Sequence, residues 1–217
     1  CGMEKHSFAV SAKYCSYCIR IADISCKVNE RAKFLPEEST IYLYEPTIEK
    51  GRDTMPLIRF PYHRYAAVYY AHRWAYGRNP LFYDYEKIGG DCTNFASQCL
   101  YAGAQIMNYT PDFGWYYIDA NNKSPSWTGV DYFYQFLTRE EESVGPTAEE
   151  CPMEEIQPGD FVQLSFNGEQ WQHTPVIVYA KKPRLLSEIL VAAHSYDADN
   201  RPLDTYNIQK FRFLHIT

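Results

Sequence analysis

The chain carries the segment GGDCTNFASQCLYAG at residues 89–103, and this segment predicts a helix that begins at a cysteine. Residues 92–102 contain neither Gly nor Pro, and Asp91 stands where an N-cap residue is expected. Cys92 then falls in the first helical turn. Four apolar side chains recur at helical spacing along the segment: Phe95, Ala96, Cys99 and Ala102.

Cys92 is predicted to be a nucleophile because of this position. Unpaired N–H groups and the positive end of the helix dipole stabilise a thiolate, which lowers the thiol pKa, and they supply donors for a developing oxyanion. Gly89 and Gly90 let the preceding loop approach closely and expose the residue that follows. The alternative is that Cys92 is a small buried apolar side chain, as most cysteines are.

A thiol nucleophile needs a base, and His173 is the candidate. Residues 161–166 alternate as a strand does, and Asn167-Gly168 is a strong hairpin signal, so a second strand is predicted from about residue 171 to residue 179. His173 would lie near the open end of that strand. Pro175 lacks an N–H group, so we expect the strand to be at a sheet edge or irregular at that residue.

His194 is predicted to stand beside His173. It lies in a third apolar run, residues 189–195, which would pair antiparallel with the second strand and place facing side chains about 5 Å apart. In a Cys-His-polar triad, His173 takes the proton of Cys92 and His194 fixes the tautomer of His173. Other residues that could orient the site are Asp91, Asp197, Asp199 and Asn200.

Together these residues resemble the putative amidase domain family of Gram-positive bacteria, within the papain-like cysteine hydrolase superfamily. The resemblance covers roughly residues 60–210 and rests on several motifs in the order of the family rather than on one short pattern. These motifs are YAAVYYA at 65–71, WA at 74–75, RNP at 78–80, GGDCTNFASQ at 89–98, SWT at 126–128, PGD at 158–160 and His173.

The resemblance implies a papain-like α+β fold, in which the cysteine-bearing helix packs on a twisted antiparallel sheet of about four to six strands. It implies a cysteine hydrolase that cleaves amide bonds in peptidoglycan stem peptides or in the link between sugar and peptide. Cys92 would carry the acyl-enzyme, His173 would be the base and His194 the third residue. No metal or other cofactor is expected. The alternatives are a thiol acyltransferase on the same fold and a non-catalytic cell-wall-binding module.

The composition narrows the expected partners. A net charge of −6, with no basic stripe, argues against a nucleic-acid partner. No apolar run approaches the roughly 18 residues of a membrane-spanning helix. The resemblance, and not the composition, implies a peptidoglycan or peptide substrate, with the protein outside the cell or at the cell wall and the cytoplasm as the alternative. The oligomeric state stays open.

Trp115 and Trp127 are predicted to line the substrate cleft. Aromatic residues make up 17% of the chain, and these two tryptophans lie in the long connection between the cysteine helix and the strands. Their rings could stack on sugar faces and flat peptide groups. Packing in the core is the alternative.

Two parts of the chain are expected: a helical segment with a connector at residues 1–56, and a catalytic domain at residues 57–217. Cys15 and Cys18 have the spacing of zinc ligands, which would suggest a zinc-dependent interaction module. The surrounding residues, however, recur at helical spacing, so we favour a helix with packed cysteines. In an exported protein Cys1, Cys15, Cys18 and Cys26 could instead form two disulfides, whose connectivity the sequence leaves open.

Overall fold

The structure, a computed structural model, describes residues 60–183 and 185–217. The described residues lie within one compact unit, Thr54–Thr217. Cys15, Cys18 and the segment expected at residues 1–56 fall outside the described part of the chain. The predicted division of the chain into two parts therefore stays a prediction.

A six-stranded sheet, in which all neighbouring strands are antiparallel, forms the centre of this unit. The order across the sheet is β3-β8-β4-β5-β6-β7. The strands are β3 (Ala148–Cys151), β4 (Phe161–Ser165), β5 (Val176–Ala180), β6 (Ile189–Ala193), β7 (Ala198–Pro202) and β8 (Lys210–Ile216). The predicted α+β class with an antiparallel sheet is confirmed.

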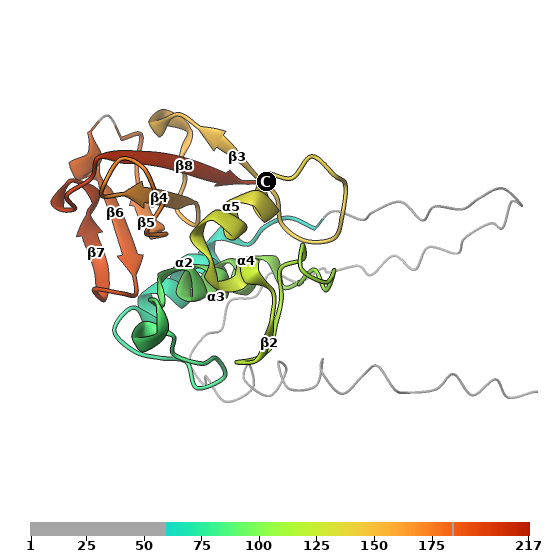
Figure 1. Ribbon diagram of the computed structural model, residues 1–217. Coiled ribbons are helices and arrows are strands. Elements are labelled where there is room, and N and C mark those ends of the chain that lie inside the picture. The colour runs from blue at the N-terminus through green and yellow to red at the C-terminus, as the bar shows by residue number, and fades with distance from the viewer. Residues whose placement is uncertain (1–59, 184) are drawn as a thin grey trace, which may run out of the picture. The chain divides into compact units, whose positions relative to one another are not determined.

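Helices gather against one face of this sheet. Figure 1 shows α2, α3 and α4 together below the strands, and α3 contacts α2, α4 and β6. The helices are α2 (Arg64–Trp74), α3 (Cys92–Ala104), α4 (Pro125–Thr128) and α5 (Val130–Leu137). Smaller elements complete the unit: the strand pair β1 (Tyr117–Asp119) and β2 (Asn122–Lys123), and the 3-10 turns η1 (Glu86–Ile88), η2 (Met153–Glu155), η3 (Leu186–Glu188) and η4 (Leu203–Thr205).

Alternation along the strands divides the core into two layers. On β4, Phe161 belongs to the cluster between the sheet and the helices, whereas Val162 belongs to a cluster on the other face. On β8, Leu214 belongs to the cluster on the helix side and Phe213 to the cluster on the other face. Because successive side chains of a strand point to opposite faces, each strand contributes to both layers. Tyr206, just after η4, belongs to the layer away from the helices.

Pro175 makes the sheet irregular without placing its strand at an edge. β5 lies between β4 and β6, and it begins only at Val176. The carbonyl of Pro175 accepts the N–H of Val162 at 3.0 Å, and His173 pairs with Leu164 in an isolated bridge. Since proline has no N–H to donate, the ladder breaks into these separate pairings.

Candidate active site

The loop before α3 sets the position of Cys92. Gly89 and Gly90 have φ angles of 110° and 103°, a region that L side chains rarely adopt, and Cys92 is the first residue of α3. A Cβ on Gly90 would lie 3.2 Å from Ser195 Oγ. The hydroxyl of Ser195 in turn accepts the N–H of Asp91 at 2.8 Å. The turn after β6 is thereby tied to the start of α3.

Cys92 lies beneath the surface, with 7% of its area exposed. Its Sγ is 3.8 Å from Thr93 Oγ1 and 3.9 Å from the carbonyl oxygen of Gln172. Burial raises the pKa of this thiol, and the carboxylate of Asp91 acts in the same direction, against hydrogen bonds from Thr93 and Thr174. The prediction of a lowered thiol pKa is therefore wrong for the structure, because desolvation outweighs the helix start.

Cys92 lies beside the backbone of His173. Its sulfur neighbours are Gln172 and Thr174, the residues on either side of that histidine. The hydroxyl groups of Thr93 and Thr174 are 3.3 Å apart and join the first turn of α3 to the residues that lead into β5. The fold thus brings the two predicted catalytic segments together.

The imidazole of His173 is buried and lacks a hydrogen bond at Nε2. It is 3% exposed, and its ring centroid lies 5.6 Å from that of Tyr206 and 6.1 Å from that of Phe166. Burial, followed by the positive charge of Arg201, lowers the pKa of His173 to about 4. The ring is therefore neutral near pH 7 and can accept a proton.

His194 bonds to Asp91 and not to His173. Its Nδ1 is 2.6 Å from Asp91 Oδ2 and its Nε2 is 2.9 Å from the carbonyl oxygen of Trp74, so both ring nitrogens already have acceptors. The ring also stacks on Phe95, with the centroids 4.0 Å apart. The predicted pairing of His194 with His173 is thus not formed.

The alternation of side chains explains this separation. Ala192 on β6 belongs to the core layer on the helix side, and His194 lies two residues further along. Ile177 on β5 belongs to the opposite layer, and the ring of His173 contacts Tyr206 of that same layer. The two histidines therefore project from opposite faces of the sheet.

Asp91 is fully buried and organises the loop before α3. Its Oδ1 accepts the N–H of Tyr85 at 2.9 Å and the side-chain amide of Asn94 at 2.8 Å, and its carboxylate makes no capping bond to α3. Arg78 Nε lies 3.7 Å from Asp91 Oδ2. Asp91 thus orients the helix start through His194, Tyr85 and Asn94.

The other predicted orienting residues lie further out. Asp197 accepts two hydrogen bonds from Arg78, each of 3.0 Å, and that arginine in turn lies near Asp91. Asp199 Oδ1 accepts a hydrogen bond from His72 Nδ1 at 2.7 Å on the surface. Asn200 is an exposed residue of β7 with a φ of 53°. Among residues 60–183 and 185–217, no hydrogen bond or ion pair connects Asn200 to Cys92.

The prediction that Trp115 and Trp127 line a substrate cleft is wrong. Both side chains are fully buried, and their rings stack with centroids 5.0 Å apart. Each indole N–H has a partner on α3, since Trp115 donates to Ser97 Oγ at 3.0 Å and Trp127 donates to Asn94 Oδ1 at 2.9 Å. The large apolar area of the rings is used to hold α3 in the core.

Sequence reasoning missed Tyr206 and Arg201. The hydroxyl of Tyr206 is buried without a hydrogen-bond partner, and the guanidinium of Arg201 lies 3.7 Å from the centroid of the Tyr206 ring. Burial raises the pKa of Tyr206, while the neighbouring guanidinium of Arg201 acts against this shift. Neither residue belongs to a motif, so only the tertiary structure places them here.

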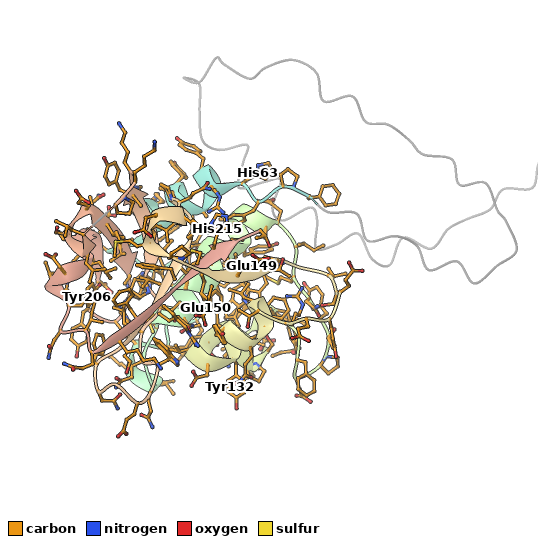
Figure 2. The ribbon with its side chains drawn as sticks, turned by 90° about the horizontal axis from the view of Figure 1, so that it is seen from above. His63, Tyr132, Glu149, Glu150, Tyr206 and His215 are labelled. Carbon is orange, nitrogen blue, oxygen red and sulfur yellow. The ribbon has the colours of Figure 1, made fainter. Side chains whose placement is uncertain are left out.

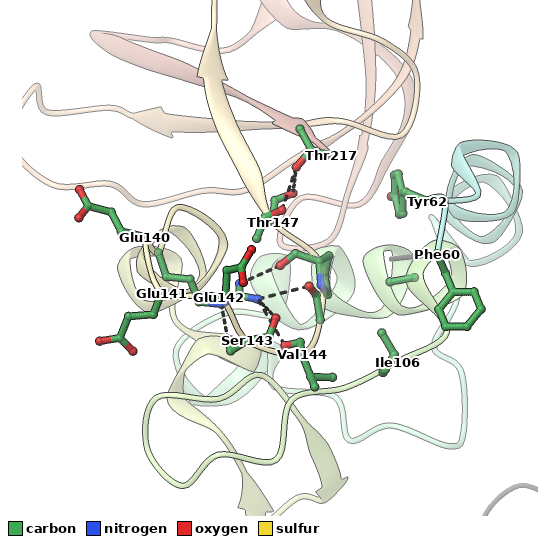
Figure 3. Close-up of a pocket in the computed structure, with 14 residues that line it drawn as sticks. Phe60, Tyr62, Ile106, Glu140, Glu141, Glu142, Ser143, Val144, Thr147 and Thr217 are labelled. Atoms are coloured by element: carbon green, nitrogen blue, oxygen red, sulfur yellow. Dashed lines mark hydrogen bonds between the residues drawn. The ribbon is translucent and has the colours of Figure 1, made fainter. Parts of the chain in front are cut away.

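Two other features are separate from this site. A cavity of about 250 Å³, drawn in Figure 3, is lined by residues 139–147 after α5, by Thr217, and by Phe60, Tyr62, Ala104 and Ile106, and neither Cys92 nor His173 lines it. His215 is another histidine outside the site, and its Nδ1 lies 2.8 Å from Asp160 Oδ2. Figure 2 shows His215 well apart from Tyr206. Within residues 60–183 and 185–217, no group of His, Cys, Asp and Glu side chains could hold a metal ion.

Comparisons with known proteins agree with an amidase assignment. The family model described as "Putative amidase domain" matches residues 61–217. The chain is also similar to the uncharacterized protein YhbB of Bacillus subtilis (strain 168), with 32% identity over 145 residues. That alignment covers 65% of the chain and 44% of YhbB, so the chain spans less than half of that relative. No solved structure matches the chain significantly. In the described part of the chain, no helix has the length and apolar character that crossing a membrane requires.

Proposed function

Since the chain belongs to the family described as "Putative amidase domain", we propose that it is a papain-like cysteine hydrolase that cleaves amide bonds through an acyl-enzyme on Cys92. The proposed substrates are the stem peptides of peptidoglycan or the link between sugar and peptide, as the sequence motifs imply. A substrate of this kind places the protein outside the cell or at the cell wall.

The observation that carries the proposal is the contact between the first residue of α3 and the segment that bears His173. Cys92 Sγ lies 3.9 Å from the carbonyl oxygen of Gln172, and the adjacent imidazole is neutral with a free Nε2. Nucleophilic catalysis by cysteine requires a thiol and an unprotonated imidazole, and the segments that carry these two groups meet here.

The resting pair is uncharged, so we propose that proton transfer accompanies the attack. In this mechanism a bound substrate places its carbonyl carbon at Sγ. Its binding also moves the His173 ring to the thiol proton. Sγ then bonds to the carbon while His173 takes the proton. The imidazolium returns this proton to the leaving nitrogen, and the thioester is hydrolysed by a water molecule that His173 deprotonates.

The start of α3 supplies the donors for the oxyanion. Asp91 makes no side-chain capping bond to the helix, so its carboxylate does not occupy the N–H groups of the first turn. The N–H of Cys92 and its neighbours can then bind the negative oxygen, with help from the helix dipole. His194 and Asp91 act as positioning residues, because together they fix the loop from which Cys92 emerges.

Replacing Cys92 with Ala tests this assignment. We expect the fall in amide cleavage to be at least about 1,000-fold, because the acyl-enzyme cannot form. Digested peptidoglycan incubated with the protein and analysed by mass spectrometry gives the rate and identifies the bond cut. The folded state should persist, as judged by circular dichroism.

Cys99→Ala is the matched control. Cys99 lies on the same helix, fully buried in the core. Its loss should lower the melting temperature and leave the cleavage rate per folded molecule near that of the wild type. Wild-type turnover by Cys92→Ala would contradict the proposed function.

A further inference from the structure

We propose that Arg201 binds a carboxylate of the substrate next to the scissile amide, which makes the enzyme selective for substrates that carry a free carboxylate there. This inference rests on the proposed function, because it assigns the substrate class of the same site. It concerns three residues that lie together: Arg201 and His173 both lie against the ring of Tyr206.

The guanidinium of Arg201 is held in a fixed orientation. Its Nε donates to Thr205 Oγ1 at 2.8 Å and its Nη2 donates to the carbonyl oxygen of Thr205 at 3.0 Å. Its Cζ stands 3.7 Å from the centroid of the Tyr206 ring. An arginine restrained in this way loses little side-chain entropy when it binds an anion.

Arg201 has no carboxylate partner, a property that it shares with Arg73 and Arg139, whereas three other arginines of the described residues have one. Arg64 pairs with Asp160, Arg78 pairs with Asp197, and Arg212 lies 4.0 Å from both Asp131 and Glu150. Within residues 60–183 and 185–217, no Asp or Glu oxygen lies within 4.0 Å of the Arg201 guanidinium nitrogens. The protein thus positions a cation without supplying its anion.

Two buried polar atoms next to Arg201 also lack partners. They are His173 Nε2 and Tyr206 Oη, whose residues are 3% and 9% exposed. Buried polar atoms are nearly always hydrogen-bonded in native proteins. Two such atoms without hydrogen-bond partners in neighbouring side chains therefore indicate a missing polar ligand. A substrate that brings an amide and a carboxylate would provide acceptors and donors for this cluster.

A bound carboxylate would also act on the base. The charge of Arg201 is one cause of the lowered pKa of His173. An anion paired with Arg201 offsets that charge, so the imidazole becomes more basic when the correct substrate is bound. The carboxylate should therefore raise kcat as well as lower KM, which a purely structural arginine would not explain.

The test uses synthetic stem peptides, each made in a carboxylate form and in a carboxamide form that differ only beside the scissile amide. With the wild type, kcat/KM should be about 10- to 100-fold higher for the carboxylate form, as expected for a hydrogen-bonded charge pair. In Arg201→Gln the two forms should be cleaved at similar rates. Arg73→Gln is the control, because Arg73 is an exposed arginine stacked on Trp74 at 4.7 Å, and it should keep the wild-type ratio.

Binding measured by calorimetry with the Cys92→Ala variant separates the two proposals. Cleavage of both forms at equal rates by the wild type would overturn the role of Arg201 and leave the proposed function standing. Cleavage of neither form would overturn the proposed function. In that case Cys92→Ala should still bind the carboxylate form more tightly, and the Arg201→Gln change should remove the difference. Equal binding of both forms would refute the carboxylate site.

Discussion

At the scale of single residues, burial governs the chemistry of this site more than the helix start does. Desolvation raises the pKa of the Cys92 thiol and lowers that of the His173 imidazole to about 4. Both shifts favour the uncharged forms. The free protein therefore holds a thiol and a neutral base near pH 7 and not a preformed thiolate–imidazolium pair.

The pH profile of kcat/KM should report this state. Because His173 must be unprotonated to act as a base and its pKa is about 4, we expect activity to fall on acidification only near pH 4. An ordinary histidine would give this fall near pH 6.5, at its unperturbed pKa of about 6.5. The measurement is kcat/KM against pH with an uncharged carboxamide substrate.

Arg201→Gln gives an internal check on the same profile. Removing this positive charge should move the acidic limb to higher pH, since Arg201 is one cause of the lowered pKa. If the acidic limb of the wild-type profile lay at about pH 6 to 7, near the pKa of free histidine, this would be evidence against a buried neutral base.

At the scale of elements, the turn after β6 and the loop before α3 form one unit. Ser195 Oγ accepts the N–H of Asp91 and donates to Glu86 Oε2 at 2.9 Å. Ser195 and Tyr196 have φ angles of 56° and 77°, which costs free energy for residues other than glycine. These hydrogen bonds offset that cost and hold the start of α3 against the sheet.

Gly90→Ala should disturb this unit. The new Cβ would lie 3.2 Å from Ser195 Oγ, at a φ of 103° that alanine rarely adopts. We expect a loss of about 1–3 kcal/mol in the free energy of unfolding, together with reduced kcat, because the start of α3 shifts. Urea denaturation and peptide cleavage measure the two effects.

Gly77→Ala is the matched control for this change. The nearest atom to its added Cβ is Trp74 Cε3 at 3.7 Å, an ordinary contact distance. The free energy of unfolding and the kcat of Gly77→Ala should stay close to those of the wild type. Equal effects of the two substitutions would show that the positive φ of Gly90 does not matter.

At the scale of the whole domain, Asp160 joins α2 to β8. It is fully buried and accepts from Arg64 at the start of α2, from His215 Nδ1 at 2.8 Å, and from the backbone N–H groups of Gln157 and Ile216 at 2.8 and 3.0 Å. One carboxylate therefore connects segments that are distant in the sequence. The geometry at Cys92 depends on this frame, because α3 packs on α2.

Asp160→Asn should destabilise the domain by about 3–5 kcal/mol, since it leaves Arg64 without its anion in a partly buried place. Urea denaturation measures the change. Glu169→Gln, on the exposed hairpin between β4 and β5, is the control and should alter stability by less than about 0.5 kcal/mol. Similar small effects for both substitutions would contradict the joining role of Asp160.

Much of this architecture could be predicted from local patterns. Helical spacing and the two glycines indicate an element beginning near Cys92, and the alternation with Asn167-Gly168 indicates the strands around His173. The face of the sheet to which His194 points could not be predicted, because a shift of one residue in register reverses it. Composition could not separate Trp115 and Trp127 in the core from tryptophans in a cleft, because their burial depends on the packing of distant segments on α3.

The order of chemically distinctive residues along the chain determined which side chains can act: a cysteine at a helix start and a histidine just before a strand. Only the tertiary structure decided which groups meet them, namely Tyr206 and Arg201 beside His173, and His194 on Asp91. The physical reason is that burial and partner charges set whether these groups are ionised. Both depend on contacts between segments separated by tens of residues, which no local pattern encodes.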